Sequence, residues 1–351
     1  MQNRDKCNYI SIAKAIGIIL MVMGHSGSPD VLSRFLYLFH MPLFFLCSGY
    51  FFNEVPDTTS FALFFRKKIK GLYLPYLKWS LLFLVLHNLF FQINIYNSLT
   101  HSYFYSTSDF LKQLVKTIFM TDFELLLRPF WFIKELLFAS ILIAMLSLIR
   151  AKVFPKLRNE LLLFFMFLCT IVCKYTKLHL PIIGDCSVLT LSSVYFYSGI
   201  IFRKIEHNIP KTYWLTSIAF LLTIIGSYNF IGEIDMRYTT IYNLIPYYLL
   251  SISGIIMTFN ISKWINNISI NTYLYYIGNH TMPILTLNLL ALKVGNYLKI
   301  LIYNMSIEEL SSHTIIFDNN SYFWIVYIVI GTFLPLIVDR LLNIMFKKHY
   351  H

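Results

Sequence analysis

The sequence predicts an all-α, polytopic membrane protein with about ten transmembrane helices and both termini in the cytoplasm. Of its 351 residues, 57% are hydrophobic and only 13% are charged, whereas a soluble globular chain has roughly 25% charged residues. Long apolar stretches recur along the whole chain. Because so few charged side chains cannot cover a water-facing body, a soluble fold is excluded.

Ten stretches come close to the length of about 20 apolar residues that a helix needs to cross a bilayer. The first contains Lys14 and the sixth is rich in serine, which makes these two the weakest. No small-residue cleavage site follows the first stretch, so it is expected to be a span and not a signal peptide. The expected spans are residues 9–26, 35–53, 72–95, 131–149, 160–178, 187–203, 213–231, 239–259, 273–292 and 321–346.

The segment 96–130 lacks such a stretch, but its sequence FLKQLVKTIFM is amphipathic. This pattern predicts an interfacial or re-entrant helix. No internal repeat is visible. We therefore expect one integral membrane domain over residues 5–346, followed by a short basic tail at 347–351.

Lysine and arginine fall mainly in the expected loops on the side of the N-terminus. Such loops lie in the cytoplasm in most membrane proteins, so this bias predicts the orientation. It also accounts for most of the net charge of +12. The expected partners are therefore membrane lipid, an acyl-CoA and an envelope glycan, and not nucleic acid.

The five cysteines predict neither a disulfide framework nor a metal site. Most lie in or beside expected spans, and there is no even-numbered set on the outer side. Cys169 and Cys173 share a helix face, but no histidine or carboxylate is near them in sequence. No bound metal is expected.

Two histidines, His25 and His40, lie in the apolar sequence MVMGHSGSPDVLSRFLYLFHMPLFFLCSGYFF. In a helical first span, Lys14 and His25 point the same way and are about 16 Å apart along the axis. Ionisable side chains within spans usually face the bundle interior or a water-filled cavity. Three simpler roles remain open. Lys14 can reach the headgroups, His25 can cap its helix, and His40 can bond carbonyls freed by Pro42.

A basic cluster follows the second expected span in FRKKIKGLYLPYLKW. It is either ordinary positive-inside charge or a binding point for a phosphorylated cytoplasmic donor, since lysine and arginine pair well with phosphate. The cluster consists of Arg66, Lys67, Lys68 and Lys70.

Four sequences, in this order, resemble the acyltransferase-3 family of integral membrane acyltransferases: YISIAKAIGIILMVMGHSG, FHMPLFFLCSGYFF, RKKIKGLYLPYLKW and RPFWFIKELLF. The later sequence YLYYIGNHTMPILTLNLLALK is also similar to that family. The nearest branch is the sugar O-acetyltransferases of the fucose 4-O-acetylase type. The resemblance covers roughly residues 5–345 and is diffuse between 150 and 270.

The resemblance implies a ten-helix enzyme of the cytoplasmic (inner) membrane. It would move an acetyl group from cytoplasmic acetyl-CoA, a donor substrate and not a bound cofactor, to a hydroxyl of a cell-envelope polysaccharide or its lipid-linked precursor. His25 matches the family's essential histidine, Lys14 a basic residue that is commonly arginine, and the basic cluster the family's third-span cluster. Lysine at 14 lacks arginine's bidentate fork, and Asn288 stands where histidine is expected.

Acyl transfer to a hydroxyl needs a general base or a nucleophile, and a neutral imidazole does either near pH 7. The expected catalytic residues are His25, Lys14, His40 and Glu135, with Lys14, His40 or Asn279 stabilising the oxyanion. Glu135 orients an active-site partner in this interpretation; it can also simply pair with Lys134. Trp131, Asn279 and His280 are expected to contact substrate.

The alternative class is a transporter or flippase of a glycan or small solute. Charges and prolines within the expected spans are typical of transporters, and Glu135 would then relay protons. The absence of a repeat that pairs two halves argues against this class. Consumption of acetyl-CoA distinguishes the two, because only the enzyme uses it.

Overall fold

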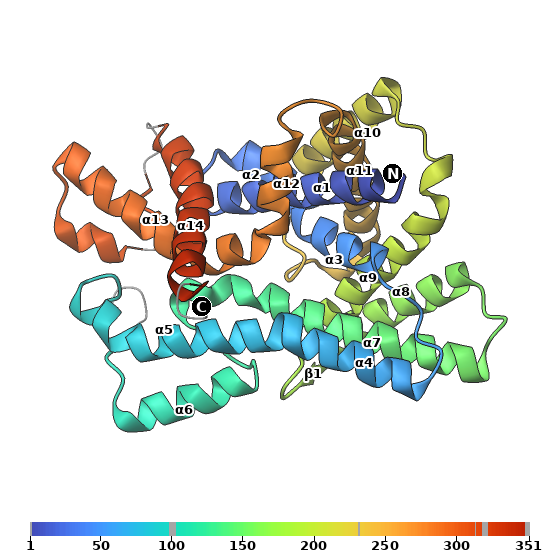
Figure 1. Ribbon diagram of the computed structural model, residues 1–351, viewed down its shortest axis with the longest axis horizontal. Coiled ribbons are helices and arrows are strands. Elements are labelled where there is room, and N and C mark those ends of the chain that lie inside the picture. Colours follow the sequence, from blue (N-terminus) through green and yellow to red (C-terminus); the bar gives the residue numbers. More distant parts are fainter. Residues whose placement is uncertain (1, 98–102, 231, 313, 318–321, 348–351) are drawn as a thin grey trace.

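The prediction of an all-α membrane protein is confirmed. The computed structural model describes residues 2–97, 103–230, 232–312, 314–317 and 322–347, so most of the expected tail 347–351 lies outside the described residues. In these ranges the chain is almost entirely helical, with a single two-stranded hairpin (Figure 1). Eight of the described helical segments are long and apolar enough to cross a membrane.

Each expected span overlaps one helical segment of the structure. The eight candidates are Asp30–Tyr50, Thr58–Gln92, Leu125–Val153, Asn159–Thr176, Cys186–Asn208, Ile241–Ile265, Thr281–Tyr303 and Phe323–Met345. The other two expected spans correspond to α1 (Gln2–Gly24), whose apolar part Asn8–Gly24 is shorter, and to α10 (Tyr213–Asn229). The orientation of these helices relative to a membrane stays a prediction.

Several candidates consist of more than one element. The first half of the chain contains α2 (Asp30–Tyr37), α3 (His40–Tyr50), α4 (Thr58–Lys68), η1 (Ile69–Tyr73), α5 (Leu74–Gln92), α6 (Thr107–Ile118), η3 (Leu125–Phe130), α7 (Trp131–Val153) and α8 (Asn159–Thr176). The second half contains β1 (His179–Leu180), β2 (Gly184–Asp185), α9 (Cys186–Ile205), η4 (Glu206–Asn208), η5 (Ile241–Asn243), α11 (Leu244–Ile265), α12 (Asn271–Asn279), α13 (Thr281–Tyr303), η6 (Ile307–Ser311) and α14 (Phe323–Lys347).

The third span begins earlier than expected, because α4, η1 and α5 form one continuous helix of 35 residues over Thr58–Gln92. Asp57 caps its start by accepting a hydrogen bond of 2.8 Å from the backbone N–H of Ser60. The wide π-helical turn Ile69–Tyr73 directly precedes Pro75, which has no N–H to continue the α-helical pattern. The basic cluster is therefore part of a helix and not of a loop.

Helix α9 is the most deeply buried of the candidate spans, although its serines made it a weak candidate in the sequence. Ser193 and Ser198 donate hydrogen bonds to the carbonyls of Leu189 and Val194 one turn earlier, so their hydroxyls are satisfied within the helix. α9 packs against α3, α7 and α8. These contacts place it at the centre of the N-terminal bundle.

The contact between α3 and α9 is made backbone to backbone through two glycines. A Cβ atom on Gly49 would lie 1.7 Å from the carbonyl oxygen of Phe196, and one on Gly199 would lie 2.1 Å from that of Leu46. No larger side chain fits at either position without separating the helices. This contact fixes the placement of α3, which begins with His40.

The ninth span differs from the prediction. The chain breaks at His280, and the long helix is α13, which packs against α14. The expected span 273–292 left Lys293 and Lys299 in an outer loop, but both lie buried within α13. Their ammonium groups donate to carbonyls of the following segment, Lys293 to Leu310 at 2.9 Å and Lys299 to Ile316 at 3.1 Å. These bonds explain why the helix continues past both charges.

The amphipathic segment forms α6, which packs against α5 (Figure 1). A capping box between Ser106 and Asp109 starts it. Leu111 and Val115 lie on the same outward side and are each 55% exposed. An interfacial position of this helix stays a prediction.

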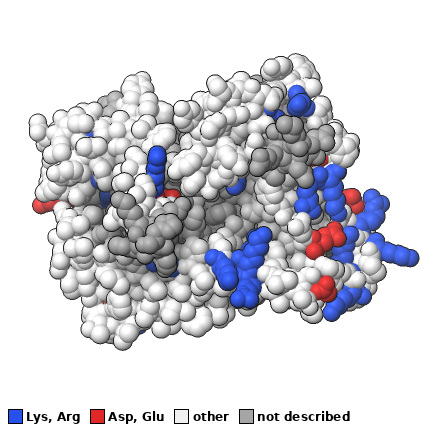
Figure 2. All heavy atoms as spheres, in the orientation of Figure 1, with Lys and Arg blue, Asp and Glu red and all other residues white. Residues whose placement is uncertain are grey.

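Charged side chains gather at one end of the molecule. Figure 2 shows lysines and arginines concentrated where α4 begins and α7 meets α8, while most of the rest of this face is uncharged. Among the exposed residues of this end are Lys152, Lys156, Arg158 and Lys204. All four belong to the loops that the sequence predicts to be cytoplasmic.

Candidate functional site

His25 is the first residue after α1, at the opposite end of that helix from the charged end of the molecule. Gly24 lets the rings and methyls of Tyr37 and Leu36 approach the helix closely. Gly27, at φ +73°, then turns the chain toward α2. The two glycines that flank His25 thus end the helix and leave the imidazole half-buried at its tip.

The His25 ring lines two cavities. Among the described residues, no hydrogen bond holds either of its nitrogens. Both are therefore available to a substrate. A histidine that served only as a helix cap would instead bond a carbonyl at the end of its own helix.

His40 is the first residue of α3, directly after the break that separates α3 from α2. Its Nδ1 lies 2.8 Å from the carbonyl oxygen of Leu36 and donates to it. Pro42 lies in the first turn of α3, where its missing N–H costs no helical bond. His40 thus satisfies a carbonyl left free by the break, and in the neutral ring Nε2 is the remaining basic nitrogen.

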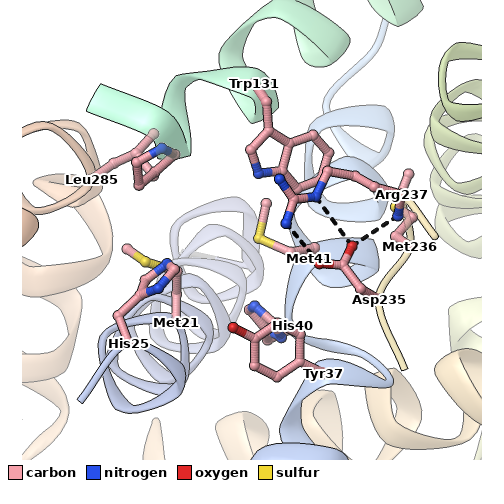
Figure 3. Close-up of a pocket in the computed structure, with 11 residues that line it drawn as sticks. Met21, His25, Tyr37, His40, Met41, Trp131, Asp235, Met236, Arg237 and Leu285 are labelled. Carbon is pink, nitrogen blue, oxygen red and sulfur yellow. Dashed lines mark hydrogen bonds and ion pairs between the residues drawn. The ribbon is translucent and has the colours of Figure 1, made fainter. Parts of the chain in front are cut away.

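A small pocket of about 40 Å³ brings His25, His40 and Trp131 together (Figure 3). His25 lies on one side of it, Trp131 projects in from the start of α7, and His40 lies with Tyr37 below. Two residues that the sequence analysis did not select complete it, Asp235 and Arg237. The remaining lining residues are Met21, Met41, Pro129, Met236 and Leu285.

Asp235 and Arg237 form a tight local pair in the segment between α10 and α11. Arg237 donates from NH2 to Oδ2 of Asp235 at 2.8 Å, and its backbone N–H donates to Oδ1 at 2.8 Å. Burial lowers the pKa of Arg237, but the hydrogen bond and the negative charge of Asp235 outweigh it and raise that pKa. The guanidinium also lies 5.0 Å from the centre of the Trp131 ring, a cation–π contact. It is a permanent, oriented positive charge beside the histidines.

A larger cavity of about 570 Å³ adjoins this pocket and shares His25, Pro129, Trp131 and Arg237 with it. Its charged lining residues, Arg128, Arg237 and Lys293, are all cationic. The other residues that line it are Phe123, Leu125, Leu126, Tyr238, Leu289 and Thr314. Such a cavity favours negative charge that develops on a bound substrate.

Lys14 is not brought to His25. Eleven residues of α1 separate them, about 16 Å along the axis as expected, and Lys14 lines neither cavity. It is half-buried and within electrostatic range of the buried Cys47. Lys14 and His25 thus belong to two levels of the same helix.

Glu135 lies one turn of α7 beyond Trp131 and is also outside both cavities. It is buried next to Lys134, and its Oε2 has no hydrogen-bond partner among the described residues. The Lys134 ammonium is directed at the β1–β2 hairpin, 3.6 Å from the place of a Cβ on Gly184. The pair is close to the histidine pocket but not part of its lining.

Asn279 and His280 lie at the other end of α1 from His25. Asn279 accepts a hydrogen bond of 3.0 Å from Ser11, which is about 21 Å from His25 along the helix. His280 donates from Nδ1 to the carbonyl of Tyr276 at 2.8 Å and stacks on that ring. Asn288 bonds two carbonyls of its own helix. None of these three residues reaches the histidine pocket.

The basic cluster is divided by its surroundings. Arg66, Lys67 and Lys70 are exposed, whereas Lys68 is half-buried, with its ammonium 5.2 Å from the Phe64 ring and 5.8 Å from the Phe196 ring. Three of the four charges are thus free to meet a solvent-borne anion. Within the described ranges, no group of three or more histidine, cysteine or carboxylate side chains has a metal-binding arrangement.

The sequence analysis missed Asp235 and Arg237. Arg237 was counted only as an outer positive charge, in the part of the chain where the family resemblance is diffuse. The spacing in EIDMRY was the available signal, since a carboxylate two residues before an arginine can form a local pair. A short loop between two spans gives no indication of which cavity it closes.

A family model described as an acyltransferase domain matches residues 8–340. This range includes both cavities, the basic cluster and every candidate residue named above. No match is found among the curated proteins or among the solved structures.

Proposed function

Because this chain belongs to the acyltransferase-3 family and is a multi-pass membrane acyltransferase, we propose that it acetylates a hydroxyl of a cell-envelope polysaccharide or its lipid-linked precursor. The proposed donor is cytoplasmic acetyl-CoA, and the proposed location is the cytoplasmic membrane. The observation that carries the proposal is the His25 imidazole, which has no hydrogen-bond partner among the described residues and lies beside the Arg237 guanidinium where two cavities meet.

In the proposed reaction, His25 takes the proton of the acceptor hydroxyl while that oxygen attacks the thioester carbonyl. The carbonyl oxygen becomes an oxyanion, which Arg237 stabilises by charge and hydrogen bonding. The carbon–sulfur bond then breaks, and the thiolate of CoA takes the proton from His25. The products are an O-acetyl ester and free CoA. A variant with the same balance passes through an acetyl-imidazole on His25.

The other candidates have supporting places in this proposal. His40 lines the pocket with its Nε2 free for substrate, and Trp131 holds Arg237 in place by the cation–π contact. Lys14, Asn279 and His280 lie toward the charged end of α1 and would contact the donor and not the reacting hydroxyl. Glu135, one turn from Trp131, would position the start of α7.

The proposal is tested with the purified full chain in liposomes, supplied with acetyl-CoA and de-O-acetylated surface polysaccharide from cells lacking the gene. We expect one CoA thiol to be released for each O-acetyl group found on the glycan by mass spectrometry. Deletion of the gene should also lower the O-acetyl content of the envelope glycan. A transporter would instead move the glycan without consuming acetyl-CoA, which would overturn the proposal.

Removing charge from the basic cluster should weaken donor binding only. The triple variant Arg66→Gln, Lys67→Gln, Lys70→Gln is expected to raise the KM for acetyl-CoA about tenfold or more, because exposed cations pair with the donor's phosphates. Turnover at saturating donor should stay near wild type. Steady-state kinetics over a range of acetyl-CoA concentrations measures both.

The matched control is Lys152→Gln, Lys156→Gln, Arg158→Gln, which removes three exposed charges from the same end of the molecule. Its KM should be unchanged. An equal rise in both variants would mean that the charge of this whole end, and not the cluster, attracts the donor.

A further inference from the structure

A second polar cavity lies beside the one that contains His25. Its volume is about 370 Å³, and it is enclosed by α5, α6, the segment 103–106 and the residues before α7. The two cavities share Phe123, Leu125 and Arg128 in their linings. The other lining residues of this second cavity are His87, Tyr103, Tyr105, Gln113, Lys116, Asp122 and Glu124.

His87 holds one wall of this cavity in place. Its Nε2 donates to the carbonyl of Tyr103 at 2.9 Å, and its Nδ1 lies 2.8 Å from Oε2 of Glu124. Its ring also stacks on that of Tyr105, with the centroids 3.5 Å apart. Since Nε2 is bound to a carbonyl and Nδ1 to a carboxyl group, His87 has no free nitrogen for catalysis. Its role is to position the wall.

Asn88 fastens the same wall a second time. Its amide nitrogen donates to the carbonyl of Tyr105 at 3.0 Å, and its Oδ1 accepts from the backbone N–H of Tyr105 at 2.8 Å. The Tyr103 side chain, 57% exposed, is therefore presented to the cavity by a fixed backbone. Burial and the nearby Glu124 carboxylate raise the pKa of the Tyr105 hydroxyl, so that it stays protonated and able to donate.

Glu124 has an unused acceptor. Its side chain is only 2% exposed, and Oε2 is bound by His87. The second oxygen, Oε1, has no hydrogen-bond partner among the described residues. A buried carboxylate oxygen without a partner is costly in a folded protein, and such atoms usually have a ligand or water partner. Here the residue lines a cavity wide enough for a small polar molecule.

We propose that this second cavity is a carbohydrate subsite that holds a sugar of the acceptor glycan while a neighbouring hydroxyl reaches His25. Tyr103, Tyr105 and Phe123 supply flat apolar surfaces for a sugar ring. Glu124, Gln113 and Asp122 supply acceptors and donors for its hydroxyls. Pockets with an apolar lining and a few converging polar groups are typical ligand sites. The inference rests on the proposed function, because it assigns the acceptor to a particular place.

The test measures how the acetylation rate depends on acceptor concentration, with de-O-acetylated surface polysaccharide from cells lacking the gene as the probe. Tyr103→Ala removes the exposed ring but keeps the carbonyl that His87 binds. We expect it to raise the half-saturating polysaccharide concentration about tenfold or more, with turnover at saturation and the KM for acetyl-CoA unchanged. Glu124→Gln removes the charged acceptor and should shift the same quantity by a similar factor.

Phe104→Ala is the matched control. Phe104 is adjacent, is 53% exposed and packs against Phe91 outside the cavity, so the half-saturating concentration should not change. An unchanged value in Tyr103→Ala, with active wild-type protein, would overturn the subsite even if Glu124→Gln failed to fold. A wild-type protein that releases no CoA with this probe would overturn the proposed function itself.

Discussion

Replacing His25 with alanine is expected to abolish acyl transfer, with a loss in kcat of at least about 10²-fold. No other described imidazole lines both cavities, so no neighbouring group can take over the proton. The protein should still insert at normal levels, because the ring makes no hydrogen bond that the described structure depends on. Initial rates of CoA release at saturating acetyl-CoA and acceptor measure the loss.

Exogenous imidazole gives a readout that a purely structural role would not produce. The cavity of about 570 Å³ beside His25 has room for a small base, so imidazole should restore part of the activity of His25→Ala. His207→Ala, an exposed histidine at the charged end, serves as the control and should be fully active. Near wild-type transfer by purified His25→Ala would show that the ring only caps its helix.

His40→Ala should cost less activity than His25→Ala. Its Nδ1 is already committed to the carbonyl of Leu36, so part of the effect should appear as lowered stability. A lost hydrogen bond of this kind contributes about 1 kcal/mol. The two effects separate when thermal unfolding and kcat are measured on the same preparation.

The second large effect is expected at Arg237. Arg237→Ala should lower kcat by about 10²- to 10³-fold, the usual cost of removing one oxyanion-stabilising group. Arg237→Lys should recover part of this, because it keeps the charge but loses the fork that bonds Asp235 and the stacking on Trp131. The KM for acetyl-CoA should change little in both variants, since the donor's phosphates are expected at the basic cluster.

Arg158→Ala is a close control for Arg237→Ala. Both arginines are paired with a carboxylate two residues away, but the ion pair of Arg158 with Glu160 is exposed and far from either cavity. Arg158→Ala should keep full activity. A loss of turnover in Lys14→Ala combined with an active Arg237→Ala would assign the oxyanion to Lys14 instead.

Much of the fold followed from hydrophobicity alone, because each apolar stretch of spanning length forms a helix. The errors occurred where polar side chains are satisfied locally. The serines of α9 bond their own helix, and Lys293 and Lys299 bond carbonyls of a neighbouring segment. A sequence shows the polar group but not its partner. It therefore underestimated α9 and ended the ninth span too early.

The site was predictable to the extent that it lies on the first spans. His25, His40 and Trp131 do meet in one pocket. Lys14, Asn279 and His280 were grouped with them by type, but the length of α1 keeps them on another level. Asp235 and Arg237 come from a distant loop, and only the packing of α10 and α11 against the N-terminal helices brings this loop to the histidines.

The continuous helix Thr58–Gln92 acts as a ruler between the two proposed binding places. Arg66 lies near its start and His87 near its end, which puts them about 32 Å apart along the axis. The hydrocarbon core of a bilayer is about 30 Å thick. With the donor's phosphates at one residue and the acceptor sugar at the other, every turnover carries an acetyl group from one leaflet to the other. The reaction is then vectorial: an activated thioester made in the cytoplasm modifies a glycan on the far side, where no acetyl-CoA is present.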